Sequence, residues 1–514
     1  MALRSHHRER IKQSRVDGEW CKVPDDVFTQ LHTSRESLAA LEHAMEGRLV
    51  LPGMDEYEAD RQIHDAAYQK FPLLIAYCRS FGDVKATLGN ATLLDWWVTC
   101  RSGGHSTAGY SVNEGVVIDL SGLAYVSVDA ANDLARVGAG TPFSMVNQTL
   151  GLYGLHVPGG GCLDVCVGGY MQGGGYGFTS REFGMNCDNA AAVTVMLYDG
   201  SIVVADSADN IDLWTAVRGG TGNNFGVLLE VTYQLRALHD LAGRVLFWPI
   251  EQAAEALATL QNDYTKTLTP QLGYMAALCN LPRPSEPGFD RGLLFMALYD
   301  GTDYNFDQAL GPLASVGTPR QLYASRAPYG VLDQQLLAFV PDPPASTPLA
   351  PSSVCEVKQS GYVASPIDAA GWEKIVAYFQ TSPNPFNLVV VEPYGGAINS
   401  YPLERSAFVH RDVYMDLFVD SFWKPGWMYN DQVEANSWLD GYMNLLAPYY
   451  NGEQYQNYPR PGLAGYRDAY WPGILDFLVG VKQKYDPKGF FRFEQMISPD
   501  PSSAARSNNP DRSP

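Results

Sequence analysis

The chain has 514 residues, 46% of them hydrophobic and 18% charged, which is typical of a soluble globular protein with two or three domains. A formal net charge of −20, with basic residues scattered along the chain, excludes the basic surface that nucleic acids and anionic membranes require. Eight cysteines are too few for a disulfide framework, and no apolar run is long enough to span a bilayer.

The first 35 residues lack periodicity and predict an arm over the surface, without the apolar segment of a signal peptide. We therefore expect a cytoplasmic protein, or a secreted one whose signal has been removed. Short β-rich runs and one helix follow. The runs DWWVTCRSGG, GVVIDLSGL and ARVGAGTPF predict strands, AAAVTVMLYDGSIVVAD predicts a hairpin turning at Asp199 and Gly200, and PFSMVNQTLGLYG predicts a helix.

A second α+β unit begins after about Leu238. The runs EQAAEALATLQNDYTKTL and DQALGPLASVG predict helices, and RGLLFMALYDG, NLVVVEPYGG and VYMDLFVDSFW predict strands. The proline-rich run PDPPASTPLAPSS predicts a loop, WPGILDFLVGVKQKYDPKG a last helix, and the residues after Pro499 a disordered tail. The expected domains are an arm at 1–35, a first domain at 36–240, a second at 241–470, a returning segment at 471–498 and a tail at 499–514.

Two stretches are too rich in glycine for an ordinary helix or strand, yet each carries one nucleophilic side chain. The first, RSGGH, ends at His105, and the second, PGGGCLDVCVGGYMQGGGYG, contains Cys162. A dinucleotide-binding Rossmann fold is disfavoured because the second stretch follows a loop and lacks the later acidic partner. The pair of Cys162 and Cys166 has no further ligand at metal-binding spacing, so we expect no metal.

The order of five motifs is more specific. RSGGH, PGGGC-x3-CVGG-x3-GGGYG, RGGTGNNFGV, YQNY and KYDPKGFF follow one another along the chain. From about residue 49 to 497 the chain resembles the berberine bridge enzyme-like group of FAD-linked oxidases, in the vanillyl alcohol oxidase and p-cresol methylhydroxylase superfamily. The resemblance implies an α+β fold: a two-part FAD-binding domain of the p-cresol methylhydroxylase (PCMH) type, and an α+β substrate domain with an antiparallel sheet over the flavin.

The resemblance also implies the cofactor contacts. By position, His105 would attach to the 8α-methyl carbon of FAD and Cys162 to its carbon 6, with Cys166 the competing thiol. Tyr170 stands where many relatives have histidine. The residues expected to bind FAD are Arg101, Ser102, Gly103, Gly104, His105, Ser106, Cys162, Val167, Gly168, Gly169, Tyr170, Gly173, Gly174, Gly175, Gly226, Val227 and Asn457.

Tyr176 and Tyr455 match positions at which related oxidases place a catalytic tyrosine, and either would need a depressed pKa to act as a base. We predict that replacing Tyr176 with Phe slows flavin reduction strongly. In VYMDLFVDSFW, alternation puts Asp416 and Asp420 on one face with Phe418, which stands where relatives have glutamate or glutamine. Asp416 or Asp420 are the candidate substitutes, with Glu392 a weaker one.

The expected reaction is oxidation of an alcohol by hydride transfer to flavin N5, with O2 reduced to H2O2. The expected partners are O2 and a small molecule, either a carbohydrate or a secondary metabolite. Two alternatives are a natural-product dehydrogenase or oxidative cyclase, and a cyclase that uses flavin as a scaffold without net redox.

Overall fold

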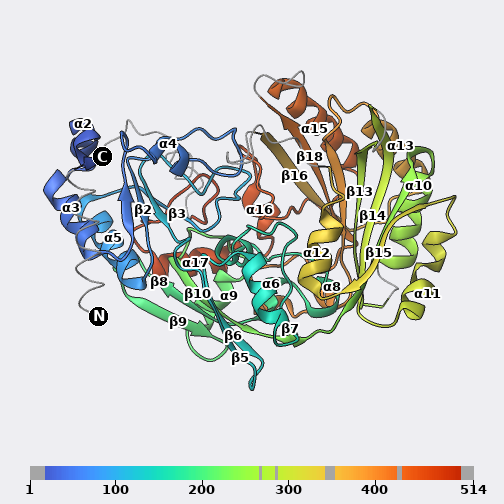
Figure 1. Ribbon diagram of the computed structural model, residues 1–514, viewed down its shortest axis with the longest axis horizontal. Coiled ribbons are helices and arrows are strands. Elements are labelled where there is room, and N and C mark those ends of the chain that lie inside the picture. Colours follow the sequence, from blue (N-terminus) through green and yellow to red (C-terminus); the bar gives the residue numbers. More distant parts are fainter. Residues whose placement is uncertain (1–17, 266–268, 284–286, 342–353, 425–430, 499–514) are drawn as a thin grey trace.

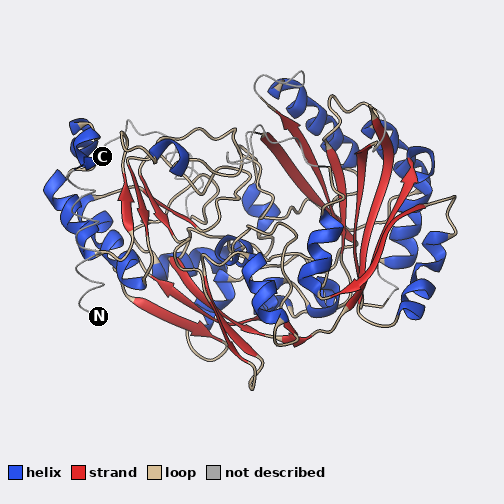
Figure 2. Cartoon of the chain, viewed as in Figure 1, coloured by secondary structure: helices blue, strands red, loops and turns tan. Residues whose placement is uncertain are grey.

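The computed structural model describes residues 18–265, 269–283, 287–341, 354–424 and 431–498 (Figure 1). The first 17 residues of the predicted arm, nearly all of the predicted proline-rich loop and the predicted tail lie outside these ranges. Helices and sheets alternate along the chain, so the predicted α+β class is confirmed (Figure 2).

The N-terminal half contains two larger sheets and a two-stranded one. A four-stranded sheet has the order β1-β2-β4-β3, with parallel pairing of β2 and β3 to β4. A five-stranded antiparallel sheet has the order β5-β6-β10-β8-β9, and β7 pairs with β11. The strand bounds are β1 Arg48–Val50, β2 Leu74–Tyr77, β3 Val98–Arg101, β4 Val116–Asp119, β5 Val126–Asp129, β6 Leu134–Gly138, β7 Leu155–His156, β8 Ala190–Met196, β9 Ile202–Asp206, β10 Val227–Gln234 and β11 Arg236–Ala237.

These strands form where β-branched residues cluster. All four residues of β4, VVID, are buried, as expected for a central strand with parallel neighbours. The predicted hairpin of β8 and β9 turns at Gly200, whose φ of +79° favours glycine. The five strand predictions in this half, including both arms of the hairpin, are therefore confirmed.

A single seven-stranded antiparallel sheet organises the second half, in the order β15-β12-β14-β13-β17-β18-β16. One face is covered by α10, α11, α13 and α15, which form an apolar core with it (Figure 1). The opposite face meets α12 and the N-terminal half. The strand bounds are β12 Leu241–Pro249, β13 Leu272–Pro282, β14 Phe289–Tyr299, β15 Arg320–Ala327, β16 Cys355–Val363, β17 Leu388–Pro393 and β18 Met415–Trp423.

Helices connect and cover the sheets. Several begin at a side-chain cap: Ser34 of α3, Ser80 of α5 and Asp431 of α15 each accept a backbone N–H from the first turn. None of the helices in the described ranges has the length and apolar character that crossing a membrane requires. The α-helix bounds are α2 Asp25–Gln30, α3 Arg35–Ala44, α4 Tyr57–Asp60, α5 Phe81–Leu94, α6 Phe143–Gly151, α7 Val167–Gln172, α8 Ser180–Phe183, α9 Ile211–Val217, α10 Ile250–Thr259, α11 Asp303–Ala314, α12 Tyr329–Leu337, α13 Ala369–Phe379, α14 Ala397–Ser400, α15 Gln432–Leu446, α16 Tyr466–Tyr470 and α17 Leu475–Tyr485. Four short turns are η1 Trp20–Lys22, η2 Asn186–Asn189, the π-helical η3 Leu260–Tyr264 and η4 Leu403–Arg405.

Two segments differ from what glycine content and periodicity suggested. The glycine-rich residues Val167–Gln172 form the short helix α7, in which Gly168 packs directly against the backbone of Ala139. The described part of the predicted arm contributes Trp20, Phe28 and Leu31 to the interior of the N-terminal half. Burial of three large apolar side chains stabilises that segment against the rest of the chain.

The last helix, α17, lies with the N-terminal half (Figure 1). The buried ammonium group of Lys482 donates to the carbonyl of Asn224 at 2.6 Å and pairs with Asp486 at 2.7 Å. The side-chain oxygen of Asn224 accepts the N–H of Ile497 at 2.8 Å. The last described segment, 482–497, is thereby attached to the loop that precedes β10.

Candidate active site

A cavity of about 1130 Å³ separates the glycine-rich loops from the seven-stranded sheet. Its floor, as we use the word, comprises cavity-lining residues at 102–107, 160–170 and 176–178. Its roof comprises lining side chains of β13, β14, β16, β17 and β18 with the end of α12. The segment 455–459 also lines it. The volume exceeds the roughly 300–1,000 Å³ of most single-ligand pockets, so a cofactor and a substrate fit together.

His105 enters this cavity from the loop that follows β3. Its Nε2 atom lies 3.2 Å from a carboxylate oxygen of Asp164, and its ring stacks on that of His64 with centroids 4.4 Å apart. The hydrogen bond from His105 lowers the pKa of Asp164 to about 2. An ionised carboxylate therefore orients the imidazole.

The two competing cysteines occupy different environments. Cys162 is exposed and lines the cavity. Cys166 precedes α7 and is buried, and its thiol donates to the carbonyl of Gly140 at 3.4 Å. Burial raises the pKa of Cys166 to about 12, which disfavours the nucleophilic thiolate. The geometry therefore favours Cys162 as the reactive thiol.

The structure brings most of the other predicted cofactor residues to the cavity wall and leaves six behind it. The side chain of Arg101 turns away to pair with Asp119 at 2.6 Å. Those that line the cavity are Ser102, Gly103, Gly104, Ser106, Gly168, Gly169, Tyr170, Gly226 and Asn457. Those behind the wall are Arg101, Val167, Gly173, Gly174, Gly175 and Val227.

The floor fits a flat cofactor. A Cβ atom added to Gly169 would have no protein atom within 4 Å, although Gly169 lines the cavity, so glycine leaves that space for a ligand. Gly103 is packed on its other side, where a Cβ would lie 3.1 Å from the sulfur of Cys166. The loops carrying His105 and Cys162 therefore lie close together beneath the open space.

Tyr176 and Tyr455 are buried and joined through the backbone. The hydroxyl oxygen of Tyr455 accepts the N–H groups of Gly175 at 2.9 Å and Tyr176 at 3.1 Å, and the amide of Asn457 at 3.0 Å. The hydroxyl of Tyr176 donates to the carbonyl of Pro393 at 3.0 Å. Burial raises the pKa of both phenols above the usual range. The depressed pKa that a tyrosine base requires is therefore not found, and the reason is desolvation.

Strand β18 shows the predicted alternation. Phe418 and Asp420 line the cavity, while Leu417 and Val419 enter the core on the other face. Asp416 points toward the cavity side but is fully buried and is absent from the described cavity wall. Of the two predicted acidic substitutes, Asp420 alone reaches the cavity.

Glu392 of β17, the weaker sequence candidate, has the most suitable environment for proton transfer. It lines the cavity with 3% of its surface exposed, and Oε1 accepts the hydroxyl of Tyr458 at 2.9 Å. Burial raises the pKa of Glu392 to about 7. Sequence reasoning missed Tyr458, although it closes the YQNY motif, and the pair Glu356 and Lys358, whose signal is two charged residues on one face of a strand.

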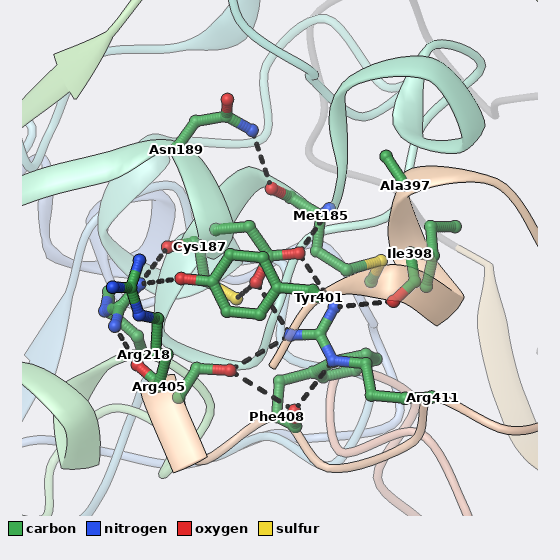
Figure 3. Close-up of polar contacts among 12 residues, drawn as sticks. Met185, Cys187, Asn189, Arg218, Ala397, Ile398, Tyr401, Arg405, Phe408 and Arg411 are labelled. Atoms are coloured by element: carbon green, nitrogen blue, oxygen red, sulfur yellow. Dashed lines mark hydrogen bonds and ion pairs between the residues drawn. The ribbon is translucent and has the colours of Figure 1, made fainter. Parts of the chain in front are cut away.

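A buried polar cluster behind the floor connects the two halves of the chain, and we call it the joint (Figure 3). It comprises Asp188 and Arg218 from the N-terminal half, and Tyr401, Arg405 and Arg411 from the second half. Arg411 donates to both carboxylate oxygens of Asp188 at 2.7 Å, and both side chains are almost fully buried. Arg218 donates to the hydroxyl of Tyr401 at 2.9 Å and to the carbonyl of Arg405. Figure 3 shows Arg218, Tyr401 and Arg411 converging from separate segments.

The joint reaches the floor through η2. The N–H groups of Asn186 and Cys187 donate to the carbonyls of Gly175 and Gly174, both at 2.8 Å. Asp188 follows directly in the same turn. The loop between β17 and β18 is thereby connected to the glycine run that precedes Tyr176.

Two family models and several known proteins match this chain. A family model described as an FAD binding domain matches residues 72–206, and one described as berberine and berberine like matches residues 454–498. An uncharacterized FAD-linked oxidoreductase of Bacillus subtilis (strain 168) is 25% identical over 463 residues, covering 88% of this chain and 97% of that protein.

Solved structures share the fold. The wild-type BBE-like 1 of Physcomitrella patens superposes with a TM-score of 0.79 at 22% identity, covering 90% of this chain and 98% of the other. A chitooligosaccharide oxidase gives a TM-score of 0.77 at 21% identity, covering 90% and 99%. The two-domain FAD-binding fold with a large antiparallel sheet, expected from the sequence, is thus confirmed.

Proposed function

The chain belongs to the berberine bridge enzyme-like FAD-linked oxidoreductases, and from this membership we propose that it oxidises an alcohol group of a carbohydrate or secondary metabolite. FAD is its cofactor. When bound, it would supply a hydride acceptor for the alcohol carbon and a route for the two electrons to O2, which would be released as H2O2. The observation that carries the proposal is Glu392, a buried carboxyl with a pKa of about 7 on the wall of the cavity that His105 and Cys162 also line.

His105 and Cys162 hold the cofactor covalently in this proposal. Asp164 orients the imidazole of His105, and the exposure of Cys162 supports its selection over the buried Cys166. Two attachments from neighbouring floor loops would fix the flavin beneath the roof. The other floor residues surround it with backbone groups and small side chains.

Glu392 accepts the proton of the substrate hydroxyl. Its hydrogen bond from Tyr458 supports the ionised form, while burial keeps the pKa near neutrality, where a general base is effective. Tyr176 and Tyr455 position the neighbouring backbone, and Asn457 donates to the hydroxyl of Tyr455. Neither phenol needs to ionise.

A second candidate function, a natural-product dehydrogenase or oxidative cyclase, is favoured by the roof. Phe418 lies between Glu392 and Asp420 along the sheet, with Met275 and Val390 also lining the cavity. An apolar centre of this kind suits a flat ring better than a sugar. A flavin-scaffolded cyclase without net redox remains the third candidate.

Anaerobic flavin bleaching, followed by peroxide release in air, tests these functions. Sugars and aromatic alcohols are presented to the wild type and to Glu392→Gln. A substrate should bleach the wild-type flavin, and the rate should rise with pH through about 7, because Glu392 must be ionised to accept a proton. Loss of a general base should slow Glu392→Gln by about 10²–10⁴-fold and remove that pH dependence.

An unchanged rate in Glu392→Gln would remove Glu392 from the mechanism. Product formation without bleaching would instead support the scaffolded cyclase.

A further inference from the structure

The roof carries a compact charged cluster at the edge formed by β16 and β18. The ammonium group of Lys358 lies 2.9 Å from a carboxylate oxygen of Glu356 and 3.1 Å from one of Asp420. The three side chains are at most 15% exposed, and all three line the cavity. We call Glu356, Lys358 and Asp420 the acidic cluster.

The cluster has more carboxyl groups than cations. Lys358 is the only lysine or arginine that the structure places on the described wall of the cavity, and two carboxylates already pair with it. Oδ1 of Asp420 and Oε2 of Glu392 are buried and make no hydrogen bond within the described chain. A buried carboxylate oxygen that accepts no hydrogen bond destabilises the protein. A ligand that donates a hydrogen bond to either oxygen would therefore bind favourably.

The cluster is displaced from the proposed reaction centre along the sheet. On the paired strands β17 and β18, Glu392 faces Asp416, and Asp420 faces Leu388. Glu392 and Asp420 are therefore four residues apart, which is about 14 Å at ~3.4 Å per residue. The rings of Phe418 and Tyr458 lie between them, with centroids 4.6 Å apart. A ligand that reaches both carboxyl groups must cross an aromatic surface.

We propose that the acidic cluster binds the protonated amine of the substrate, whose apolar body lies against Phe418. The inference rests on the proposed function for the position of the reacting carbon. An ammonium group supplies the donor that Oδ1 of Asp420 lacks, and it balances the surplus carboxyl of the cluster. A substrate carboxylate would instead approach Glu356, Glu392 and Asp420 with one shared lysine to attract it.

Burial and the charge of Lys358 shift the pKa values of both carboxyl groups in the cluster. Burial raises the pKa of Asp420 well above its usual range, against the opposing effect of Lys358. Lys358 lowers the pKa of Glu356 despite its burial.

Three probes of matched shape test the assignment on the holoenzyme: 3-phenylpropylamine, 3-phenyl-1-propanol and 3-phenylpropanoate. Calorimetric titration without oxygen at pH 7.5 measures their dissociation constants. The amine should bind at least tenfold more tightly than the alcohol, and the acid should bind most weakly. Asp420→Asn should reduce the preference for the amine to less than threefold.

Asp416→Asn is the matched control. It removes one carboxyl from the same face of β18, but outside the described cavity wall, so the preference for the amine should persist. Glu356→Gln supplies a second test if Asp420→Asn fails to fold, and should also reduce the preference. Equal binding of amine and alcohol by the wild type, or an equal effect of the variants at positions 416 and 420, would overturn the proposal.

The binding result is separate from the proposed oxidation. Flavin absorbance, recorded during the same titrations and with the sugar and alcohol panel, reports whether any compound reduces the cofactor. Selective amine binding without bleaching by any compound would uphold the acidic cluster and contradict the oxidase. Bleaching by neutral alcohols without amine selectivity would do the reverse.

Discussion

The floor of the cavity is formed largely by closely packed backbone, whereas the roof is formed by side chains. In the floor, a Cβ atom added to Gly177 would lie 1.9 Å from the carbonyl oxygen of Gly159, so the backbones touch and no side chain fits. In the roof, a regular sheet presents whole side chains such as Glu392, Phe418 and Asp420. The shape of the floor depends on glycines, which have no side chain. The shape of the roof depends on which side chain occupies each strand position.

This difference separates holding a cofactor from choosing a substrate. Contacts between backbones tolerate almost no substitution, which suits a site that must always hold the same ligand. A sheet keeps its backbone when its side chains change, because strand pairing uses main-chain hydrogen bonds. Variants in the two regions should therefore fail in different ways.

Gly177→Ala should have the largest effect. The added methyl group meets the carbonyl oxygen of Gly159, and relief requires the backbone at position 177 to move away from the backbone at 159. We expect the purified protein to lack flavin, or to fail to accumulate in soluble form. Absorbance near 450 nm relative to 280 nm measures flavin content.

Gly480→Ala is the control for that substitution. Gly480 lies within α17, and its added Cβ would have no atom within 4 Å. Alanine favours a helix over glycine by about 1 kcal/mol, so this variant should keep its flavin and gain slightly in stability. Full flavin content in Gly177→Ala would contradict the view that the floor is defined by backbone contact.

Arg411→Met tests the joint that connects the two halves of the chain behind the floor. Removing the guanidinium leaves the carboxylate of Asp188 buried without its bidentate partner. Loss of one member of a buried ion pair typically costs about 3–5 kcal/mol, measured as the free energy of unfolding. Arg411→Lys should recover only part of it, because lysine lacks the planar fork. Stability equal to wild type in Arg411→Met would show that the joint is dispensable.

Local sequence predicted the floor well for a physical reason. Gly174 and Gly175, which directly precede the floor segment 176–178, have φ values of +119° and +82°, a conformation that favours glycine at each position independently of distant residues. The backbone conformation of a glycine run can therefore be predicted from the local sequence. The same composition misled at 167–172, where packing against β6 and the following turn produces a short helix.

The roof could not be predicted in the same way. Glu392 and Tyr458 are 66 residues apart and meet only when β17 and the segment at 455–459 fold against each other. Lys358 lies on β16, which is distant from β18 in the sequence but pairs with it in the sheet. No sequence motif marks Lys358. The strand alternation predicted which face Asp420 occupies, but not the cation that it would meet.

Tyr176→Phe sharpens the comparison, because Tyr176 belongs to the floor but its hydroxyl bonds to the end of β17. The structure changes the strong effect predicted from sequence into a modest one. Loss of the hydrogen bond to Pro393 should lower the free energy of unfolding by about 1 kcal/mol. It should slow anaerobic flavin reduction by less than tenfold. A decrease of 10²–10⁴-fold would identify Tyr176 as the base after all.

Cys166→Ala should have the smallest effect, and it separates the two thiols of the floor. The Cys166 side chain is small and buried, and its thiol makes weak hydrogen bonds to backbone carbonyls, so its loss should cost about 1 kcal/mol of unfolding free energy. After proteolysis, mass spectrometry of the flavin peptides should still find the segments containing His105 and Cys162 linked through one flavin. Cys162→Ala should leave flavin on the His105 segment alone. If Cys166→Ala instead loses the bridged product, the buried thiol is the attachment site, and exposure in the floor is a poor guide to reactivity.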